Sequence, residues 1–148
     1  GDGPQKRYLM QTAEQERWQR VLFLPYEAKE RLRFSLSAAD VHLVSLRREM
    51  AGLSVPSKLY GIMAAARPVI FIGPDQSEVS LVIKEVQCGH VIRPGDTNAA
   101  IAALKSYYDH RDETEQRGHA GRMYFDRYCE RATATERFLH VLSENSSI

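Results

Sequence analysis

The chain has 148 residues, of which 43% are hydrophobic, and this is enough for one compact domain with its own core. Its formal net charge of +1 gives no electrostatic reason to expect binding to nucleic acid or to an anionic membrane. Two cysteines without metal-site spacing, and the lack of a signal peptide or an apolar run of about 18 residues, favour a cytoplasmic protein.

The first 51 residues are predicted to contain two helices and two strands, followed by a charged segment. A polar helix with one apolar side is expected over residues 5–20, and a strand over 21–24 follows it. A short amphipathic helix is expected over 27–39 and a second strand over 41–46. Residues 47–51 then form a charged connector.

The stretch 52–73, GLSVPSKLYGIMAAARPVIFIG, predicts a loop, a helix and a buried strand in immediate succession. Pro56 suits the first position of a helix, where no amide hydrogen is needed, and apolar residues then recur at helical spacing. The helix is expected to end at Arg67, because the residue before a proline is disfavoured in the α region. The unbroken apolar run 69–72 is typical of a parallel strand that is covered on both faces.

Helices and strands continue to alternate after this strand. Ser77 can cap a helix over residues 78–86. Gly89 is expected to end that helix, because glycine readily takes a positive φ. A last short strand is expected over 90–93.

The C-terminal third is predicted to be helical. Thr97 is expected to cap a helix that runs to about residue 108 and buries Ile101 and Leu104. Two more helices are expected over 111–130 and 131–143. The alternation along the whole chain indicates an α/β fold, a Rossmann-like parallel sheet flanked by helices.

The start of the helix near Pro56 is the best candidate for a binding site. Free backbone amides, the Ser57 hydroxyl and the Lys58 ammonium lie within one turn, and all of them attract an anion. The alternative is a capped surface helix with a solvated lysine. The sequence has no HExxH, Gly-x-Ser-x-Gly or Walker motif, and His42, alone in a predicted strand, is expected to be structural.

The segment VPSKLYGIMAAARPVIFIG (55–73) resembles the signature of the C-terminal domain of retaining glycosyltransferases with the GT-B fold. It is most similar to the bacterial family-4 type that builds O-antigen, capsule and exopolysaccharide. The other segments that match in the same order are GDGP (1–4), VLFLP (21–25), AADVHLVSL (38–46), SEVS (77–80) and CGHVIRPGD (88–96). The resemblance therefore covers nearly the whole chain.

This resemblance implies that residues 1–148 are a single, partial nucleotide-sugar-binding domain, truncated at its N-terminus. The intact enzyme would transfer a sugar from a nucleoside diphosphate sugar, which is its substrate, to a glycan or lipid-linked acceptor. The acceptor would bind to an absent N-terminal domain, so the chain alone is expected to be inactive. The resemblance implies neither a cofactor nor a metal, and it allows peripheral membrane contact of the full-length enzyme.

The residues that the resemblance assigns to the donor are Ser57, Lys58, Leu59, Gly61, Glu78 and Gly3. Many members of the family carry two glutamates, but Ala51 or Leu53 and Gly61 stand at those positions here. Contact with phosphate or sugar is then expected from Ser57 and Lys58. Glu78 is the nearest remaining acid, and its carboxylate either binds the donor or only complements the helix dipole.

Two alternatives belong to other functional classes. A non-catalytic sugar-nucleotide-binding or regulatory module could use the same fold, and the missing glutamates favour it. An unrelated flavodoxin-like module is disfavoured, because the acidic cluster of a response regulator is absent.

Overall fold

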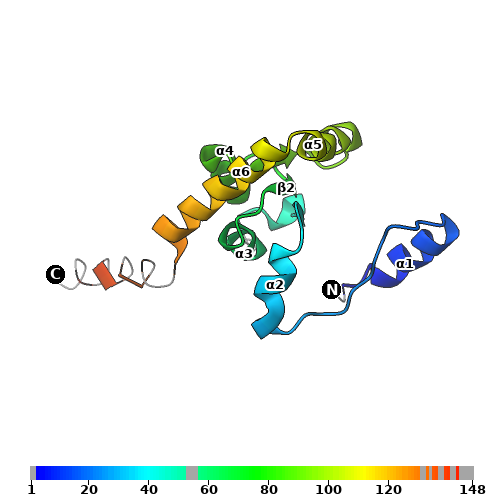
Figure 1. The fold of residues 1–148 in the computed structure, drawn as a ribbon, viewed down its shortest axis with the longest axis horizontal. Helices are drawn as coiled ribbons and strands as arrows, with labels where there is room; N and C mark the ends of the chain where they lie inside the picture. Colours follow the sequence, from blue (N-terminus) through cyan, green and yellow to red (C-terminus); the bar gives the residue numbers. More distant parts are fainter. Residues whose placement is uncertain are drawn as a thin grey trace. The chain divides into compact units, whose positions relative to one another are not determined.

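The computed structural model describes residues 3–52 and 57–130, and beyond them only residues 133, 135, 136, 139, 140 and 143. The chain divides into two compact units, Gly1–Ser35 and Leu36–Ile148, and each is described by itself. Figure 1 labels the six α-helices and the central strand, numbered in chain order. The helix predicted over 131–143 lies largely outside the described residues.

The first unit contains helix α1 (Lys6–Gln15), the 3-10 turn η1 (Lys29–Arg31) and the beginning of helix α2 (Leu32–Ser37). The helix predicted over 5–20 is therefore real but shorter, because the chain turns at Arg17, which has a φ of 52°. The strand predicted over 21–24 is wrong. The chain forms no strand over 21–24, and the side chains of Leu22 and Leu24 are mostly exposed, so little apolar burial stabilises an extended segment there.

The second predicted helix of this region, over 27–39, forms only as η1 and α2. No side chain caps the start of η1, and the apolar Leu32 and Phe34 of α2 are exposed. With little apolar burial to stabilise it, the helix stays short.

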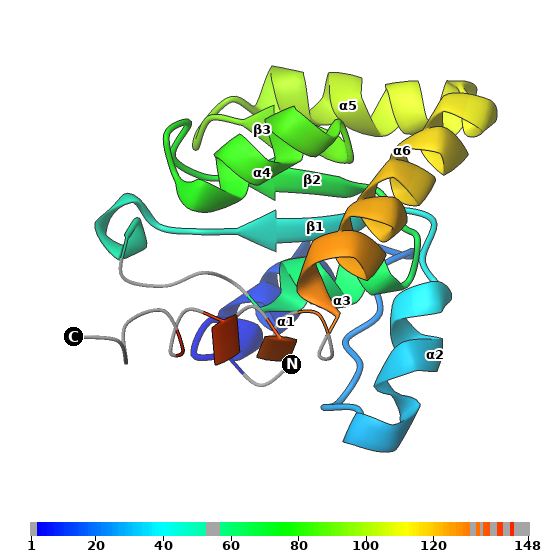
Figure 2. The same ribbon diagram turned by 90° about the vertical axis from the view of Figure 1, so that its left-hand side faces the viewer.

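The second unit is built on three parallel strands, β1 (His42–Ser45), β2 (Val69–Ile72) and β3 (Gly89–Ile92), in that spatial order. The register aligns Val69 with His42 on one side and with Gly89 on the other. The predicted interior strand 69–72 is thus confirmed residue for residue. Figure 2 shows the arrowheads of β1 and β2 pointing to the same side.

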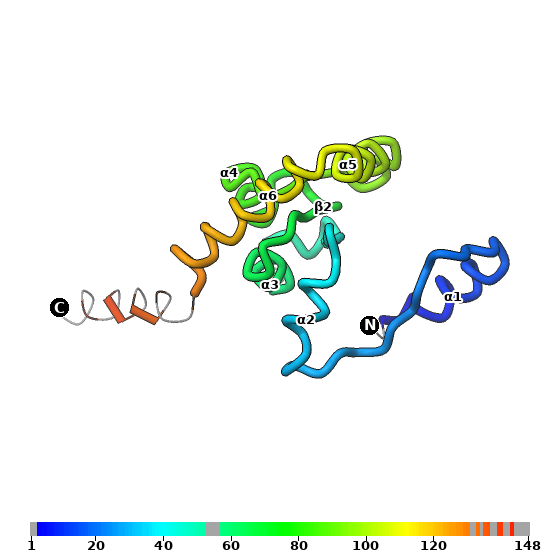
Figure 3. The backbone as a smooth tube through the Cα atoms, viewed as in Figure 1, coloured from blue at the N-terminus to red at the C-terminus, as the bar shows by residue number. Residues whose placement is uncertain are grey.

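Helices cover both faces of this sheet, as expected of an α/β fold. On one face, Val69 and Phe71 pack with α3 (Lys58–Ala64) and α4 (Glu78–Val86) in a core whose side chains are almost fully buried. On the other face, Ile70 and Ile92 pack against α5 (Thr97–Asp109). Figure 3 traces the path from α3 through β2 into α4; the helix and strand of the predicted loop-helix-strand succession are present, while residues 53–56 of its loop lie outside the described residues.

Helix α6 (Arg111–Tyr124) and the π-turn η3 (Phe125–Cys129) complete the second unit, where a single helix was predicted over 111–130. Two arginines of α6 bind backbone carbonyls of the layer beneath. Arg122 Nη1 donates to the carbonyl of Ala64 at 2.7 Å, and Arg117 Nη1 donates to the carbonyl of Gly89 at 3.4 Å.

Two local predictions, about the end of α4 and the cap of α5, are wrong. Gln87, not Gly89, ends α4 with a left-handed φ of 59°. Gly89 instead begins β3, where a Cβ atom would lie 2.1 Å from the Val69 carbonyl oxygen, so only glycine fits. Asp96, not Thr97, caps α5, because its carboxylate accepts the amide of Ala99 at 2.9 Å.

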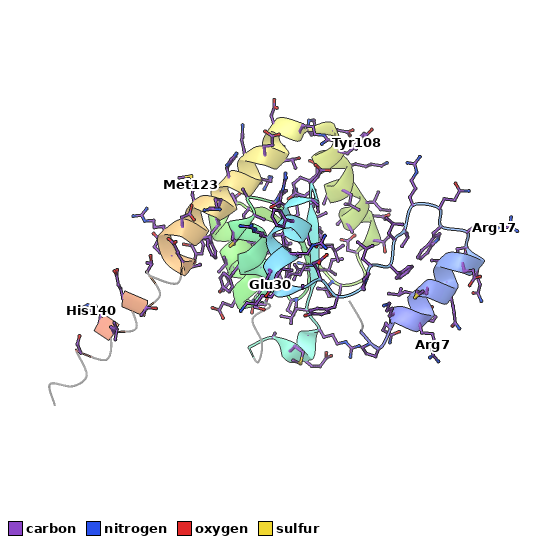
Figure 4. The ribbon with its side chains drawn as sticks, turned by 60° about the horizontal axis from the view of Figure 1, so that its bottom comes forward. Arg7, Arg17, Glu30, Tyr108, Met123 and His140 are labelled. Carbon is purple, nitrogen blue, oxygen red and sulfur yellow. The ribbon has the colours of Figure 1, made fainter. Side chains whose placement is uncertain are left out.

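The buried face of α5 also differs from the prediction. Ala103 and Tyr107 face the sheet, whereas Ile101 and Leu104 are about half exposed. Farther along, Tyr108 and Met123 lie on the outer faces of α5 and α6 (Figure 4) and are 76% and 73% exposed. Ala100, Ala103 and Tyr107 recur three to four positions apart and form the face that packs on the sheet, which leaves Ile101 and Leu104 on another side of the helix.

Candidate functional site at the carboxyl edge of the sheet

The loops that follow the three strands meet at one edge of the sheet, because the strands are parallel. Two backbone hydrogen bonds extend the ladder beyond the strands and hold these loops in register. The Leu46 amide donates to the Ile72 carbonyl at 3.0 Å, and the Gly73 amide donates to the Ile92 carbonyl at 3.1 Å. Ligands of open α/β sheets bind at this carboxyl edge.

The loop after β2, residues 73–77, is held by side chains of the helix that follows it. The Ser77 and Ser80 hydroxyls both donate to the Pro74 carbonyl, at 2.9 and 2.6 Å, and both side chains are buried. The Ser77 oxygen also accepts the Ser80 amide at 3.3 Å, which confirms Ser77 as the cap of α4.

Lys84 binds the same loop from one turn further along α4. Its ammonium donates to the Asp75 carboxylate at 2.6 Å and to the Asp75 carbonyl at 3.3 Å. The hydrogen bond and charge of Lys84 lower the pKa of Asp75, and the positive charge of Arg93 adds to the effect. Asp75 is therefore a carboxylate that is already neutralised by a lysine.

Two adjoining cavities open at this edge. One, of about 600 Å³, is lined by Arg48, the 73–77 loop, Arg93 and Pro94. The other, of about 750 Å³, shares Arg48 and Pro94 and adds Arg47 and Glu49. Within the described residues, neither Arg48 nor Arg93 has an ion pair or a side-chain hydrogen bond. This edge therefore presents guanidinium groups that have no ion-pair partner among the described residues and can donate hydrogen bonds to an anion.

Two of the predicted donor residues, Ser57 and Lys58, begin α3 but line neither cavity among the described residues. Ser57 is the N-cap, yet its side chain makes no capping hydrogen bond. The Lys58 ammonium lies against β1, 3.5 Å from the Leu43 carbonyl oxygen, which is a long, weak contact. Their role in donor binding stays a prediction.

The other predicted donor residues have varied surroundings, and their role in donor binding also stays a prediction. Leu59 is fully buried in the core, and a Cβ atom at Gly61 would lie 3.0 Å from Leu36. Glu78 is exposed in the first turn of α4, near enough to Tyr60 for its negative charge to help burial raise the pKa of that phenol. Gly3 belongs to the first unit.

Arg48 and Arg93, which the structure places at this edge, were not among the residues predicted from the sequence. Their positions in the sequence could have pointed to them. Arg48 lies in the charged connector directly after a predicted strand, and Arg93 stands before Pro94-Gly95 at the end of another. Basic residues that directly follow parallel strands are expected at the ligand-binding edge.

The buried histidines have structural surroundings. The His42 ring lies 2.8 Å from the Leu36 carbonyl through Nε2, which agrees with its predicted structural role. Burial lowers its pKa; the hydrogen bond to Leu36 opposes this, while the charges of Lys58 and Arg67 add to it. Burial also lowers the pKa of His90, which packs edge-on against Tyr107. The described residues include no group of three or more His, Cys, Asp or Glu side chains placed to hold a metal ion.

A third cavity, of about 310 Å³, lies at the opposite, amino edge of the sheet. Its wall includes Val41 and Pro68, which precede β1 and β2, and Arg111 at the start of α6. Arg111 lies 3.5 Å from the Asp40 carboxylate, so its charge is partnered. Arg67 lines the same cavity and donates from Nη2 to the Ser37 carbonyl at 2.7 Å, while its buried Nε has no partner among the described residues.

Comparison with known proteins shows which kind of enzyme part of this chain resembles. No protein-family model matches the sequence. None of the described helices is both long and apolar enough to cross a bilayer. Over 71 residues the chain is 42% identical to "Probable glycosyltransferase WbjE" of Pseudomonas aeruginosa. The aligned region is 48% of this chain but 18% of that relative, so the chain is similar to a small part of a glycosyltransferase.

Proposed function

We propose that this chain is the donor-binding part of a glycosyltransferase and that it binds a nucleoside diphosphate sugar at the carboxyl edge of its sheet. The similarity to a glycosyltransferase supports a role of this general kind over a non-catalytic module. The parallel sheet covered by helices on both faces is an architecture that binds nucleotides at this edge.

One observation supports the proposal most directly: the cavity of about 600 Å³ that lies beside the 73–77 loop and carries unpaired positive charge. Its size suits a small organic ligand. Its one acid, Asp75, is paired with Lys84, so the lining attracts anions rather than cations. A nucleoside diphosphate sugar combines a strongly anionic diphosphate with polar and aromatic parts, and such a cavity can accommodate it.

The chemistry follows from the charge that develops during transfer. When the bond between the sugar and the diphosphate breaks, the leaving diphosphate gains negative charge. Fixed cationic groups that face this charge lower the barrier more than they stabilise the bound substrate. The resemblance to retaining enzymes of the GT-B type implies transfer with retention of the anomeric configuration, to a glycan or lipid-linked acceptor bound by another part of the protein.

We propose that the Glu78 carboxylate accepts hydrogen bonds from hydroxyl groups of the bound nucleoside diphosphate sugar. Glu78 stands at the start of α4, directly after the 73–77 loop, and is exposed. An acidic residue in the first turn of a helix is favourable for the helix dipole. This exposed carboxylate, next to the loop that lines the cavity, is proposed to replace one of the two missing glutamates.

Titration calorimetry with a panel of nucleoside diphosphate sugars tests the proposal. The panel covers uridine, guanosine, adenosine, cytidine and thymidine donors, with the matching nucleosides as controls. We expect saturable binding of at least one donor to the 148-residue chain and none of its nucleoside at the same concentration. Failure of every donor to bind would contradict the proposed function.

A further inference from the structure

We infer that Arg48 and Arg93 together bind the diphosphate of the donor, from the two sides of the 73–77 loop. The inference rests on the proposed function and assigns the anion contact to side chains that the sequence motif does not include. Both arginines line the same cavity of about 600 Å³.

The first argument is the placement of the two residues on the sheet. Arg48 follows β1 and Arg93 follows β3, so they flank β2 and its loop. Neighbouring strands lie about 4.8 Å apart, which separates β1 from β3 by roughly 10 Å. Two extended arginine side chains can converge across that distance on one ligand above the end of β2.

The second argument is that the backbone of both residues is held in place. The Arg48 carbonyl accepts the Ala51 amide at 3.2 Å in the 3-10 turn η2 (Arg48–Met50). The Arg93 carbonyl accepts the Asp96 amide at 3.1 Å, in a turn that Gly95 completes with a φ of 90°. The side chains therefore extend from fixed points, while their guanidinium groups have no protein partner among the described residues.

The third argument concerns the competing acid. Asp75 lies in the same cavity and close enough to Arg93 for the arginine charge to lower its pKa. It makes its ion pair with Lys84 instead, at 2.6 Å. Lys84 thus keeps Asp75 from neutralising Arg93, and both arginines remain available to an anion.

The presence of two guanidinium groups, rather than one, indicates how many phosphoryl groups the ligand carries. Each guanidinium can bind one phosphoryl group through two parallel hydrogen bonds. Two of them, placed on opposite sides of the same loop, match two linked phosphoryl groups. The site is therefore expected to prefer a diphosphate to a monophosphate, whatever the base and sugar.

The test measures binding by calorimetry to the wild-type chain and to the variants Arg48→Gln, Arg93→Gln and Arg93→Lys. The probes are inorganic pyrophosphate, inorganic phosphate and five nucleoside diphosphates. Arg111→Gln is the matched control, because it removes the same charge at the opposite edge of the sheet. Thermal melts establish that each variant is folded.

We expect pyrophosphate to bind more tightly than phosphate. Each glutamine variant should weaken pyrophosphate and nucleoside diphosphate binding about tenfold, the equivalent of ~1.4 kcal/mol. Arg93→Lys should lose less, because the charge remains while the two-point contact is lost, and Arg111→Gln should bind like the wild type.

Two results would overturn the inference while leaving the proposed function intact. One is nucleoside diphosphate binding that is unchanged in Arg48→Gln and Arg93→Gln. The other is an equal loss in Arg111→Gln, which would show a general effect of net charge. If no nucleoside diphosphate and no sugar nucleotide binds to the wild type, both the inference and the proposed function fail.

Discussion

The hydroxyl of Ser80 links the buried core to the loop at the candidate site, and its removal is a sharp test of how that loop is held. Ser80 is fully buried, and its Oγ donates to the Pro74 carbonyl at 2.6 Å and lies 3.0 Å from the Ser77 Oγ. Ser80→Ala deletes both contacts and leaves the α4 backbone unchanged, because alanine is the best helix former.

The expected cost follows from what remains after the deletion. Each serine hydroxyl has one proton and both protons are donated to the Pro74 carbonyl, so the deletion removes one hydrogen bond, which typically contributes about 0.5–1.5 kcal/mol. The Pro74 carbonyl is not left unpaired, since the Ser77 hydroxyl and the Ser77 amide still donate to it at 2.9 and 3.1 Å. We therefore expect Ser80→Ala to lower the free energy of unfolding by about 0.5–1.5 kcal/mol.

Urea denaturation followed by circular dichroism measures this loss, with Ser77→Ala and the double variant completing a thermodynamic cycle. Because both hydroxyls share one carbonyl and contact each other, the two losses should not add. Additive losses, or a loss below about 0.3 kcal/mol for Ser80→Ala, would refute the reasoning that these hydroxyls jointly hold the loop.

Three further predictions concern the core, the pH response and the activity. Gly89→Ala should lower the free energy of unfolding by at least ~2 kcal/mol in the same denaturation assay, because the new Cβ would lie 2.1 Å from the Val69 carbonyl oxygen in the central strand. The control is Gly3→Ala, which should leave the free energy of unfolding unchanged because no atom lies within 4 Å of the new Cβ. Folding lowers the pKa of His42 below 6.5, so the unfolded chain binds the proton more tightly than the folded chain. The free energy of unfolding should therefore be highest above about pH 6.5 and should fall below that pH by up to ~1.4 kcal/mol per pH unit. His42→Gln should reduce this slope, and an unchanged slope would contradict the assignment to His42. The 148-residue chain should transfer no labelled sugar to a lipid-linked acceptor, because the acceptor-binding part is proposed to lie elsewhere, and measurable transfer would show that this chain contains a complete active site.

Elements with strong local signals were predictable from the sequence. Strand 69–72 is an unbroken apolar run between a proline and a glycine, which locates both of its ends, and the capping serine before helix 78–86 locates the start of that helix. The alternation of such elements indicated a parallel sheet flanked by helices, which the structure confirms. By contrast, segment 21–24 has the composition of a strand but pairs with none in the described chain, because a strand depends on a partner that its own sequence does not specify.

The sequence by itself therefore determined the fold class and the order of its central elements, because hydrophobic periodicity and capping act over a few neighbouring residues. Only the tertiary structure decided which side chains meet. Helix α5 is apolar on several sides, and contact with the sheet selected Ala103 and Tyr107 over Ile101 and Leu104. In the same way, Arg48 and Arg93 are 45 positions apart in the chain, and it is the parallel packing of β1 and β3 around β2 that brings both to one cavity.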